Sequence, residues 1–290
     1  MAKPLVSIIL PNYNHAPYLE ERLDSIINQT YSNFELIILD DNSSDESLEI
    51  LKRFENHDKV SHFIINAVNS GSPFKQWQKG LNLVKGDYVW IAESDDKVDY
   101  NFLESQIDTL LSNDCDIVVA ETLKFNNDKG VYGEVNHPIF NRHLKQELIL
   151  DDVLYCPILN VNASVFKANL ISKAKTFATY NIIGDRVFYH EAFFGKMIVQ
   201  NMDTKAFFRK SEDSVSALDH RSLSYYKNYF YEHIRFLNNI NETTPVTSEL
   251  HNQYVKKFFN RVRYRLSRSE KLNFTFLKMY LKFRQNLKGS

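Results

Sequence analysis

The stretch VSIILPNYNHAPYLEERLDSIINQTYSNFELIILDD, residues Val6 to Asp41, contains the pattern that decides the fold. Its two ends, Val6–Tyr13 and Phe34–Asp41, are apolar on both faces, as expected for strands of a parallel sheet that is covered on both sides. Between them, Tyr18–Thr30 carries apolar residues at helical spacing. The stretch therefore predicts a strand, a helix and a second strand.

The same alternation continues to about residue 125. Further strands are predicted at His62–Val68, Tyr88–Asp96 and Ile117–Phe125, and helices at Ser44–Glu55, Pro73–Val84 and Asp99–Ser112. This alternation predicts right-handed βαβ units and an α/β fold, a mostly parallel open sheet flanked by helices.

The pattern changes in the second half of the chain. It loosens from Val131 to about residue 219, where a helix at Ile183–Gly195 and a strand at Lys196–Gln200 are predicted. From Ser222 onward, aromatic residues recur at helical spacing, with Asn238–Ser248 as the best candidate break. We therefore predict a main domain at residues 1–220, with halves at 1–100 and 101–220, and a helical extension at residues 221–290.

Composition limits the class of protein. The chain has 290 residues, of which 43% are hydrophobic and 24% charged, so it can form a sizeable core. Its two cysteines lack CxxC spacing, which favours a reducing compartment without a disulfide framework or zinc site. No apolar run approaches the roughly 18 residues of a membrane span. These features predict a cytoplasmic protein.

Polar residues gather where the first, second and fourth predicted strands end, at Asn12–Asn14, Asp40–Asn42 and Glu93–Asp96. In open α/β sheets, ligands bind at the carboxyl ends of the strands. One such cluster would be consistent with a solvated loop, but three together indicate a site.

The third cluster places three carboxylates, Glu93, Asp95 and Asp96, within four positions. Like charges this close repel one another and are costly to desolvate, so a cation is expected nearby. Two adjacent aspartates suit Mg²⁺ or Mn²⁺ whose remaining ligands are phosphate oxygens. On the pair alone, capping of the helix predicted from Asp99 is an equally good explanation.

The first two clusters suit a nucleotide. Asp41 stands where its strand stops, and a carboxylate there can accept from a base N–H or a ribose hydroxyl. For Ser44 and Asp45, a turn leading to a helix N-cap is the better interpretation. Tyr13 is placed to stack on a base, worth roughly 1–3 kcal/mol, with an ordinary core position as the alternative.

Three motifs in this order carry a resemblance to a known family: PNYN at Pro11–Asn14, DDNSSD at Asp40–Asp45 and KGDYVWIAESDD at Lys85–Asp96. Residues 5–100 resemble the nucleotide-sugar-binding half of family-2 glycosyltransferases with the GT-A fold. The resemblance extends more weakly to about residue 216.

The resemblance implies a set of site residues. Donor-binding positions fall on Pro11, Tyr13, Asn14, Asp41 and Asp95, and Lys75 joins them as the candidate replacement for a charge that the family pattern has and this sequence lacks. The family's ligands for a divalent metal, Mn²⁺ or Mg²⁺, correspond to Asp95 and Asp96, with Asp96 favoured as the direct ligand. The segment IIGDRVFYHEAFFGK resembles the family's acceptor-half helix and implies that Asp185 is the general base. A positioned carboxylate can take the proton of an acceptor hydroxyl, although Asp185 would also suit a helix start.

The sequence departs from the family pattern in two places. The stretch from Asn69 to Gly80 is one residue longer than usual and lacks an Arg-Asn pair, so Lys75 is the candidate replacement for the missing positive charge. Arg209 is not followed two residues later by histidine, and His220 is a weak substitute, because a lone histidine is more often structural. These departures keep a non-catalytic protein that binds nucleotide sugar or membrane as one alternative. A nucleotidyltransferase of the same fold is the other, although the first strand lacks the Gly-rich loop that it would need.

The C-terminal segment is strongly basic. Between Lys256 and Lys288 there are eleven Lys and Arg residues and one acid, Glu270. Interleaved with apolar residues, they predict peripheral contact with an anionic membrane, which suits a lipid-linked acceptor. A helical cap with a solvated basic face is weighed equally. No motif supports nucleic-acid binding.

Taken with the resemblance, the sequence predicts an inverting, metal-dependent glycosyltransferase. It would move a sugar from a UDP-linked donor to a sugar hydroxyl of a glycan or glycolipid acceptor in surface polysaccharide synthesis, at the inner face of the plasma membrane.

Overall fold

The computed structural model describes residues 3–126, 130–137, 140, 145–210 and 221–289. The chain divides into two compact units, residues 1–211 and 212–290. The boundary that we predicted after residue 220 adjoins residues 211–220, which lie outside the described residues, as does His220. That boundary stays a prediction.

The first unit is built on one mixed sheet, whose order in the described part of the chain is β3-β2-β1-β4-β9-β6-β10-β5, with β7 beside β6 and β8 beside β10. The strands are β1 (Val6–Asn12), β2 (Phe34–Asp40), β3 (Val60–Ile65), β4 (Tyr88–Ile91), β5 (Lys97–Val98), β6 (Ile117–Asn126), β7 (Gly130–Glu134), β8 (Lys145–Glu147), β9 (Ser164–Lys167) and β10 (Met197–Arg209). Strands β1 to β4 pair in parallel, as do β6 and β10, whereas β9 runs antiparallel to β4 and β6.

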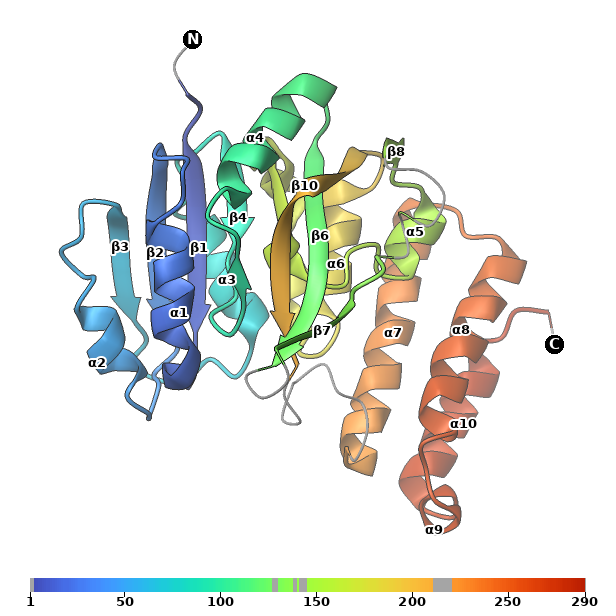
Figure 1. The fold of residues 1–290 in the computed structure, drawn as a ribbon. Coiled ribbons are helices and arrows are strands. Elements are labelled where there is room, and N and C mark those ends of the chain that lie inside the picture. The colour runs from blue at the N-terminus through green and yellow to red at the C-terminus, as the bar shows by residue number, and fades with distance from the viewer. Residues whose placement is uncertain (1–2, 127–129, 138–139, 141–144, 211–220, 290) are drawn as a thin grey trace. The chain divides into compact units, whose positions relative to one another are not determined.

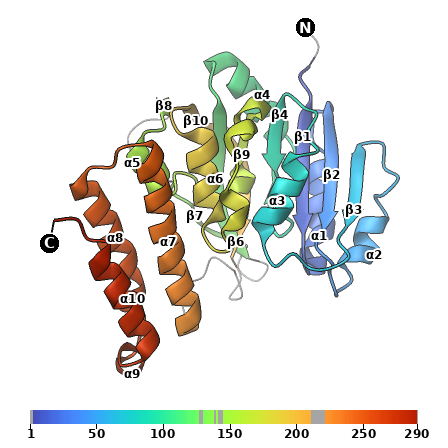
Figure 2. The same cartoon turned by 180° about the vertical axis from the view of Figure 1, so that it is seen from behind.

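Helices cover both faces of this sheet. They are α1 (Ala16–Ile27), α2 (Ser47–Lys52), α3 (Pro73–Leu81), α4 (Phe102–Asn113), α5 (Leu150–Leu154) and α6 (Gly184–Phe193). Helices α1 and α4 lie on the face nearer the viewer in Figure 1, and α3 and α6 lie on the opposite face, seen in Figure 2. This arrangement confirms the predicted α/β class.

The core strands β1, β2 and β4 are buried along their whole length, which explains why they are apolar on both faces. In the parallel register Asn12 lies opposite Asp40, so the polar clusters after β1 and β2 share one sheet edge. Strand β4 ends at Ile91 rather than at the predicted Asp96, because the chain leaves the sheet before its acidic residues.

Other bounds also differ from the prediction. Helix α1 begins at Ala16, two residues early, because Pro17 is well suited to the first turn of a helix. Strand β10 has 13 residues and extends to Arg209, well beyond the predicted Gln200. Its pairing with β6 continues after an irregularity between Asn201 and Lys205. This longer strand brings Arg209 to the site edge.

The second unit is helical, with α7 (Leu223–Thr243), α8 (Ser248–Arg263), α9 (Arg268–Lys271) and α10 (Phe274–Gln285). The predicted break narrows to residues 244–247, because buried Leu237 and Ile240 extend the apolar face of α7. Phe259 of α8 stacks on Phe283 of α10, with ring centroids 4.1 Å apart. In the described residues, no helix combines the length and apolar character that crossing a bilayer requires.

Candidate active site

The three polar clusters predicted from the sequence meet at the carboxyl edge of the sheet. Asn12 Nδ2 donates to Asp40 Oδ2 at 2.8 Å, which joins the first cluster to the second. His15 Nδ1 lies 2.7 Å from Ser94 Oγ, which joins the start of α1 to the third cluster. The three strand ends therefore lie together as predicted, and their use as a binding site stays a prediction.

Asp41 is the centre of a hydrogen-bonded group that we call the Asp41 corner: Asp41, Asn66, Ser70 and Gln76. Its Oδ1 accepts from Asn66 Nδ2 at 2.6 Å, from Ser70 N at 2.8 Å and from Gln76 Nε2 at 2.8 Å. Its Oδ2 accepts from Ser70 Oγ at 2.7 Å. The carboxylate, in a residue only 3% exposed, is therefore fixed in one orientation.

The PNYN motif forms the rim beside this corner. Tyr13 is 46% exposed, so it is not the core residue that the alternative interpretation required. Asn14 has a left-handed backbone with φ of 54°, and its Oδ1 accepts from Ser44 N at 2.8 Å. Pro11 is buried in β1 opposite Leu39. Tyr13 is thus the member of the motif whose ring is open to a ligand.

Residues Glu93–Asp96, which we call the acidic turn, follow β4. Asp96 is 1% exposed, and its oxygens accept from Asn160 Nδ2 and Arg209 N, both at 2.8 Å. Burial, and then the charge of Asp95, raise the pKa of Asp96 well above its usual range. These partners, and an α4 that begins only at Phe102, argue against helix capping as the role of the acidic turn.

Glu93 and Asp95 complete the acidic turn. Glu93 Oε1 accepts from Trp77 Nε1 at 2.7 Å, and burial, followed by the charge of Asp95, raises the pKa of Glu93 to about 7. Asp95 is partly exposed, and its carboxylate accepts no hydrogen bond from the described residues. Asp95 is therefore the carboxylate of this turn that is most available to a ligand.

A buried cation that the sequence analysis missed faces the acidic turn. Arg22 of α1 is completely buried, its Nη2 donates to Asn162 Oδ1 at 2.6 Å, and its guanidinium lies 4.7 Å from the ring centroid of Trp90. Burial lowers the pKa of Arg22 to about 10, against the opposing influence of Asp96, Asp95 and Glu93. An arginine among the apolar positions of an amphipathic helix was the available signal.

Arg209 closes the acidic turn from β10. Its backbone N–H binds Asp96, and its Nε donates to the Asp95 carbonyl oxygen at 2.6 Å. Its guanidinium lies between the rings of Tyr18 and Phe125, 4.4 and 4.3 Å from their centroids. Although the Arg-x-His pattern is incomplete in the sequence, its arginine directly fixes the acidic turn.

Asp185, the second residue of α6, is brought to the same region from the other half of the unit. Its Oδ1 accepts from Arg186 N at 2.8 Å, and Cys156 Sγ lies 3.9 Å from Oδ2. Burial raises the pKa of Asp185. The charge of Asp185 in turn contributes to the raised pKa of Glu93, so these carboxylates are electrostatic neighbours.

Lys75 lies on the exposed side of α3, and its Nζ donates to the Ser70 carbonyl oxygen at 2.9 Å. It is therefore near the Asp41 corner, and its contact with a donor phosphate stays a prediction.

The carboxylates of the acidic turn are the candidate ligands for a divalent metal. In the described residues, no three His, Cys, Asp or Glu side chains converge on one metal position. Mg²⁺ at nucleotide sites usually needs only one or two carboxylates, because substrate phosphates and water complete its octahedron. Asp95, whose carboxylate accepts no hydrogen bond within the described part of the chain, and the adjacent Asp96 fit that donor set.

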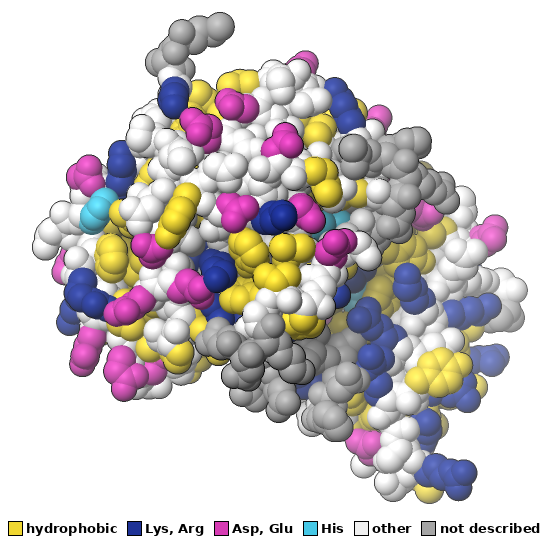
Figure 3. Space-filling view, viewed as in Figure 1, with side chains coloured by type: hydrophobic (Ala, Val, Ile, Leu, Met, Phe, Trp, Pro, Cys, Tyr) yellow, Lys and Arg dark blue, Asp and Glu magenta, His cyan; other side chains and the backbone are white. Residues whose placement is uncertain are grey.

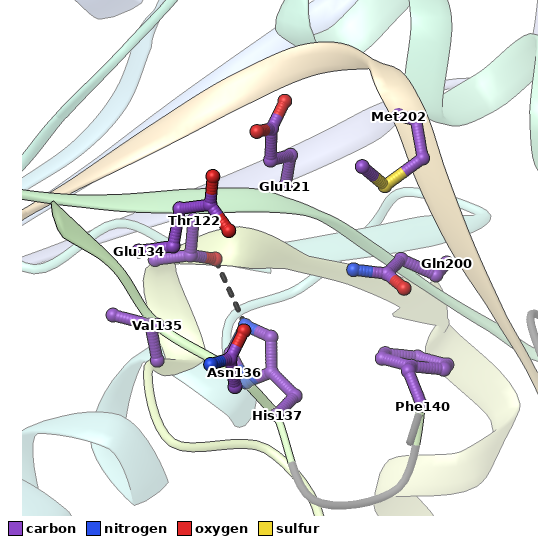
Figure 4. Close-up of a pocket in the computed structure, with 9 residues that line it drawn as sticks. All are labelled: Glu121, Thr122, Glu134, Val135, Asn136, His137, Phe140, Gln200 and Met202. Carbon is purple, nitrogen blue, oxygen red and sulfur yellow. Dashed lines mark hydrogen bonds between the residues drawn. The ribbon is translucent and has the colours of Figure 1, made fainter. Parts of the chain in front are cut away.

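A separate cavity of about 210 Å³ lies beside β6, β7 and β10 (Figure 4). Within it, His137 Nε2 lies 2.9 Å from Thr122 Oγ1, and His137 Nδ1 accepts from Leu159 N at 3.0 Å. Burial lowers the pKa of His137 to about 4, so the ring is neutral at physiological pH and has a structural role.

The fold and this site define the class. The model of the family described as "Glycosyl transferase family 2" matches residues 7–173, and the chain belongs to that family. The putative teichuronic acid biosynthesis glycosyltransferase TuaG of Bacillus subtilis is 36% identical over 113 residues, covering 39% of this chain and 44% of TuaG.

Two solved structures share the fold. S. aureus TarS 1–349 in complex with UDP-GlcNAc has a TM-score of 0.70 at 19% identity, covering 97% of this chain and 81% of that one. The mannosyltransferase PcManGT from Pyrobaculum calidifontis, in complex with GDP-Man and Mn²⁺, has a TM-score of 0.59 at 15% identity, covering 99% and 85%. They confirm the predicted GT-A fold. The chain spans only 44–58% of the length of the first curated relatives that it matches.

Proposed function

We propose that this chain is an inverting, metal-dependent glycosyltransferase that uses a UDP-linked sugar and extends a glycan or glycolipid of a surface polysaccharide. The observation that carries the proposal is that α6, which begins at Gly184 and Asp185, packs through Phe188 on Trp77, whose indole donates to Glu93 of the acidic turn. A base for the acceptor and a metal-binding turn for the donor are the two parts that such a transfer requires.

The donor would occupy the carboxyl edge of the sheet. The Asp41 corner would hold the base, since Asp41 Oδ2 accepts one hydrogen bond from the described residues and keeps a lone pair for a base N–H. The exposed ring of Tyr13 would stack on the base, and Lys75 would attract the diphosphate. The UDP-GlcNAc in the TarS structure supports the choice of a uridine donor.

Asp95 and Asp96 would hold Mn²⁺ or Mg²⁺, as the Mn²⁺ in the PcManGT complex supports. When bound, the ion supplies Lewis-acid stabilisation for the charge that develops on the leaving nucleoside diphosphate. Arg22, buried behind the acidic turn, would neutralise part of the carboxylate charge whether or not the ion is present.

Asp185 would take the proton of the acceptor hydroxyl. As that oxygen forms its bond to the anomeric carbon, the bond from the same carbon to the diphosphate oxygen breaks on the opposite side, which inverts the configuration. The raised pKa of Asp185 makes its carboxylate a stronger base than an exposed aspartate. The name of TuaG, which refers to teichuronic acid biosynthesis, supports a surface polysaccharide as the acceptor.

The first test is hydrolysis of UDP-, GDP- and dTDP-sugars by the purified chain, with Mn²⁺ and with EDTA. We expect Mn²⁺-dependent release from one UDP-sugar, abolished in Asp95→Asn and Asp96→Ala. Binding of a donor without release or transfer would favour the non-catalytic alternative. If the folded protein neither binds nor hydrolyses any of these donors, the proposal is refuted.

The role of Asp185 is tested separately. Asp185→Asn should retain donor binding in calorimetry and lose transfer by roughly 10²–10⁴-fold, the usual contribution of a general base. Asp151→Asn is a matched control, because Asp151 is also an acid in the first turn of a helix, α5. Loss of donor binding in a folded Asp185→Asn variant would contradict the assigned role.

For the second unit we propose peripheral contact with an anionic membrane through the segment 264–284. Large apolar side chains exposed there are Tyr264, Leu272, Phe274, Leu277, Tyr280 and Leu281. Phe274, Leu277 and Leu281 follow helical spacing on the outward face of α10, whereas Met279 is buried on its inward face. Figure 3 shows that Lys and Arg side chains also gather on the visible face of this unit. Apolar insertion flanked by Lys and Arg is the signature of an interfacial helix.

Sedimentation with vesicles tests this contact. The chain should bind vesicles that contain phosphatidylglycerol and not those of pure phosphatidylcholine, and Leu277→Asp should weaken binding. Leu111→Asp, at an exposed leucine of α4 in the first unit, should leave binding unchanged. Equal binding to both kinds of vesicle, or none, would leave the solvated basic face as the explanation.

A further inference from the structure

The segment Phe74–Trp77 at the start of α3 is the place where the sequence departs from the family pattern. The proposed function uses its Lys75 and, as a member of the Asp41 corner, its Gln76. The three side chains other than Lys75 are buried, between 3% and 7% exposed. Each contacts a different part of the site.

Gln76 contacts the Asp41 corner. Its Nε2 donates to Asp41 Oδ1 at 2.8 Å and lies 3.1 Å from Ser70 Oγ. It therefore orients the carboxylate to which we assign base recognition.

Trp77 contacts the acidic turn. Its indole Nε1 donates to Glu93 Oε1 at 2.7 Å. Its ring packs edge-on against Phe74 and Phe188, with centroids 5.3 and 6.0 Å away. The indole is fixed on both sides, so the position of its N–H, and with it that of Glu93, is well defined.

Phe74 contacts the start of α6. A Cβ added to Gly184 would lie 2.4 and 2.5 Å from ring atoms of Phe74, closer than real contacts allow. The ring therefore lies directly on the backbone that precedes Asp185. Glycine is required at this position by the close approach of Phe74.

Helix α3 is itself held firmly on the sheet. A Cβ on Gly80 would lie 2.4 Å from Ile9 Cγ2, so the helix backbone rests on β1. A support of this kind can transmit position, because side chains held by packing keep their geometry.

We propose that Phe74, Gln76 and Trp77 are positioning residues, and that the first turn of α3 sets the relative placement of the Asp41 corner, the acidic turn and Asp185. This inference rests on the proposed function. The segment Phe74–Trp77, which departs from the family pattern, would then have a role: it aligns the donor-binding and acceptor-activating parts of the site. A misplacement of about 1 Å can cost roughly 100-fold in rate, so such alignment matters for transfer.

The test compares three substitutions that each disturb one contact, with KM, kcat and Mn²⁺ activation measured for donor transfer. Gln76→Met keeps the volume and loses the N–H donor, and it should raise the donor KM roughly tenfold with little change in kcat. Trp77→Phe loses the indole N–H that holds Glu93 beside the proposed ligands Asp95 and Asp96. It should raise the Mn²⁺ concentration for half-activation, by less than the roughly 10–100-fold that direct partners of metal ligands contribute.

Gly184→Ala should displace the start of α6 from Phe74. We expect kcat to fall by about 100-fold while calorimetric donor affinity stays unchanged. The control is Tyr31→Phe. It removes the hydrogen bond from the buried Tyr31 hydroxyl to the Pro4 carbonyl oxygen, and neither of these residues contacts the site. It should lower Tm without changing any kinetic parameter.

The three different kinetic signatures distinguish positioning from general destabilisation. Suppose that the wild type turns over donor. If KM, kcat and Mn²⁺ activation are then unchanged in all three variants, or change by the same amount in each, the inference is overturned and the proposed function stays intact. Absence of donor turnover in the wild type would refute the proposed function, and the inference would fall with it.

Discussion

The Asp41 corner and the acidic turn lie at the same sheet edge, but they handle negative charge in opposite ways. The single carboxylate of Asp41 accepts four hydrogen bonds from its neighbours. The three carboxyl groups of the acidic turn accept one at Glu93, two at Asp96 and, from the described residues, none at Asp95. Neutral donors thus satisfy the corner, whereas the turn remains electrostatically crowded.

The comparison shows how the site can be rigid where it would recognise a base and unsatisfied where it would receive a cation. Hydrogen bonds to an isolated carboxylate fix it in place at little electrostatic cost. Adjacent carboxylates raise one another's pKa, as Asp95 does for both Glu93 and Asp96. A positive charge is needed to offset this repulsion between carboxylates, and Arg22 provides only part of that charge.

The largest effect should come from removing that cation. Arg22→Met should destabilise the protein by roughly 3–5 kcal/mol at neutral pH, because the acidic turn keeps its charges without their buried partner. The loss should shrink near pH 4, because the raised pKa values of Glu93 and Asp96 leave these two carboxyl groups protonated there. Urea denaturation in EDTA at both pH values measures it.

Arg53→Met is the control for Arg22→Met. Arg53 forms an exposed ion pair with Glu20, and its loss should change stability by less than about 1 kcal/mol. If Arg22→Met were equally destabilising at pH 7 and pH 4, the role of Arg22 would be packing against Trp90 rather than charge compensation.

A smaller effect is expected at the Asp41 corner. Asp41→Asn turns one acceptor into a donor that faces other N–H or O–H groups, which should cost about 1–3 kcal/mol at any Mn²⁺ concentration. It should also weaken binding of UDP in calorimetry. Unchanged stability would mean that the four hydrogen bonds contribute less than their geometry indicates.

The smallest effect should have the opposite sign. Asp95→Asn removes a charge that raises the pKa of Glu93 and of Asp96, so in EDTA we expect it to stabilise the protein by about 1 kcal/mol, the equivalent of a shift of roughly one pKa unit. In Mn²⁺ the wild type should become the more stable of the two proteins, because it gains stability from the ion and Asp95→Asn does not.

The pH dependence gives a second check on Asp95→Asn. The pKa of Glu93 is raised to about 7 from 4.5, so the folded protein holds this proton more tightly than the unfolded chain. The resulting stability is full below pH 4.5 and is lost as pH rises through 7. The gain in stability from Asp95→Asn should therefore appear only as pH rises from 4.5 through 7. A gain of the same size at pH 4 would contradict the electrostatic explanation.

The sequence by itself determined the framework of the site. Apolar runs on both faces predicted the buried strands β1, β2 and β4, and the polar residues that follow them predicted the site edge. Parallel strands place their carboxyl ends together whatever else the chain does, so this inference needed no side-chain contacts. The motifs added Asp41 and the acidic turn as positions of interest.

Only the tertiary structure decided how each carboxylate is satisfied. Asp96 is bound by Asn160, 64 residues away, and Arg22 by Asn162, 140 residues away. Periodicity reports which side of an element is buried, but it carries no information about the partner packed against that side. For this reason the sequence predicted that a cation should face the acidic turn, whereas the structure alone identified Arg22 as a buried cation that the protein supplies there.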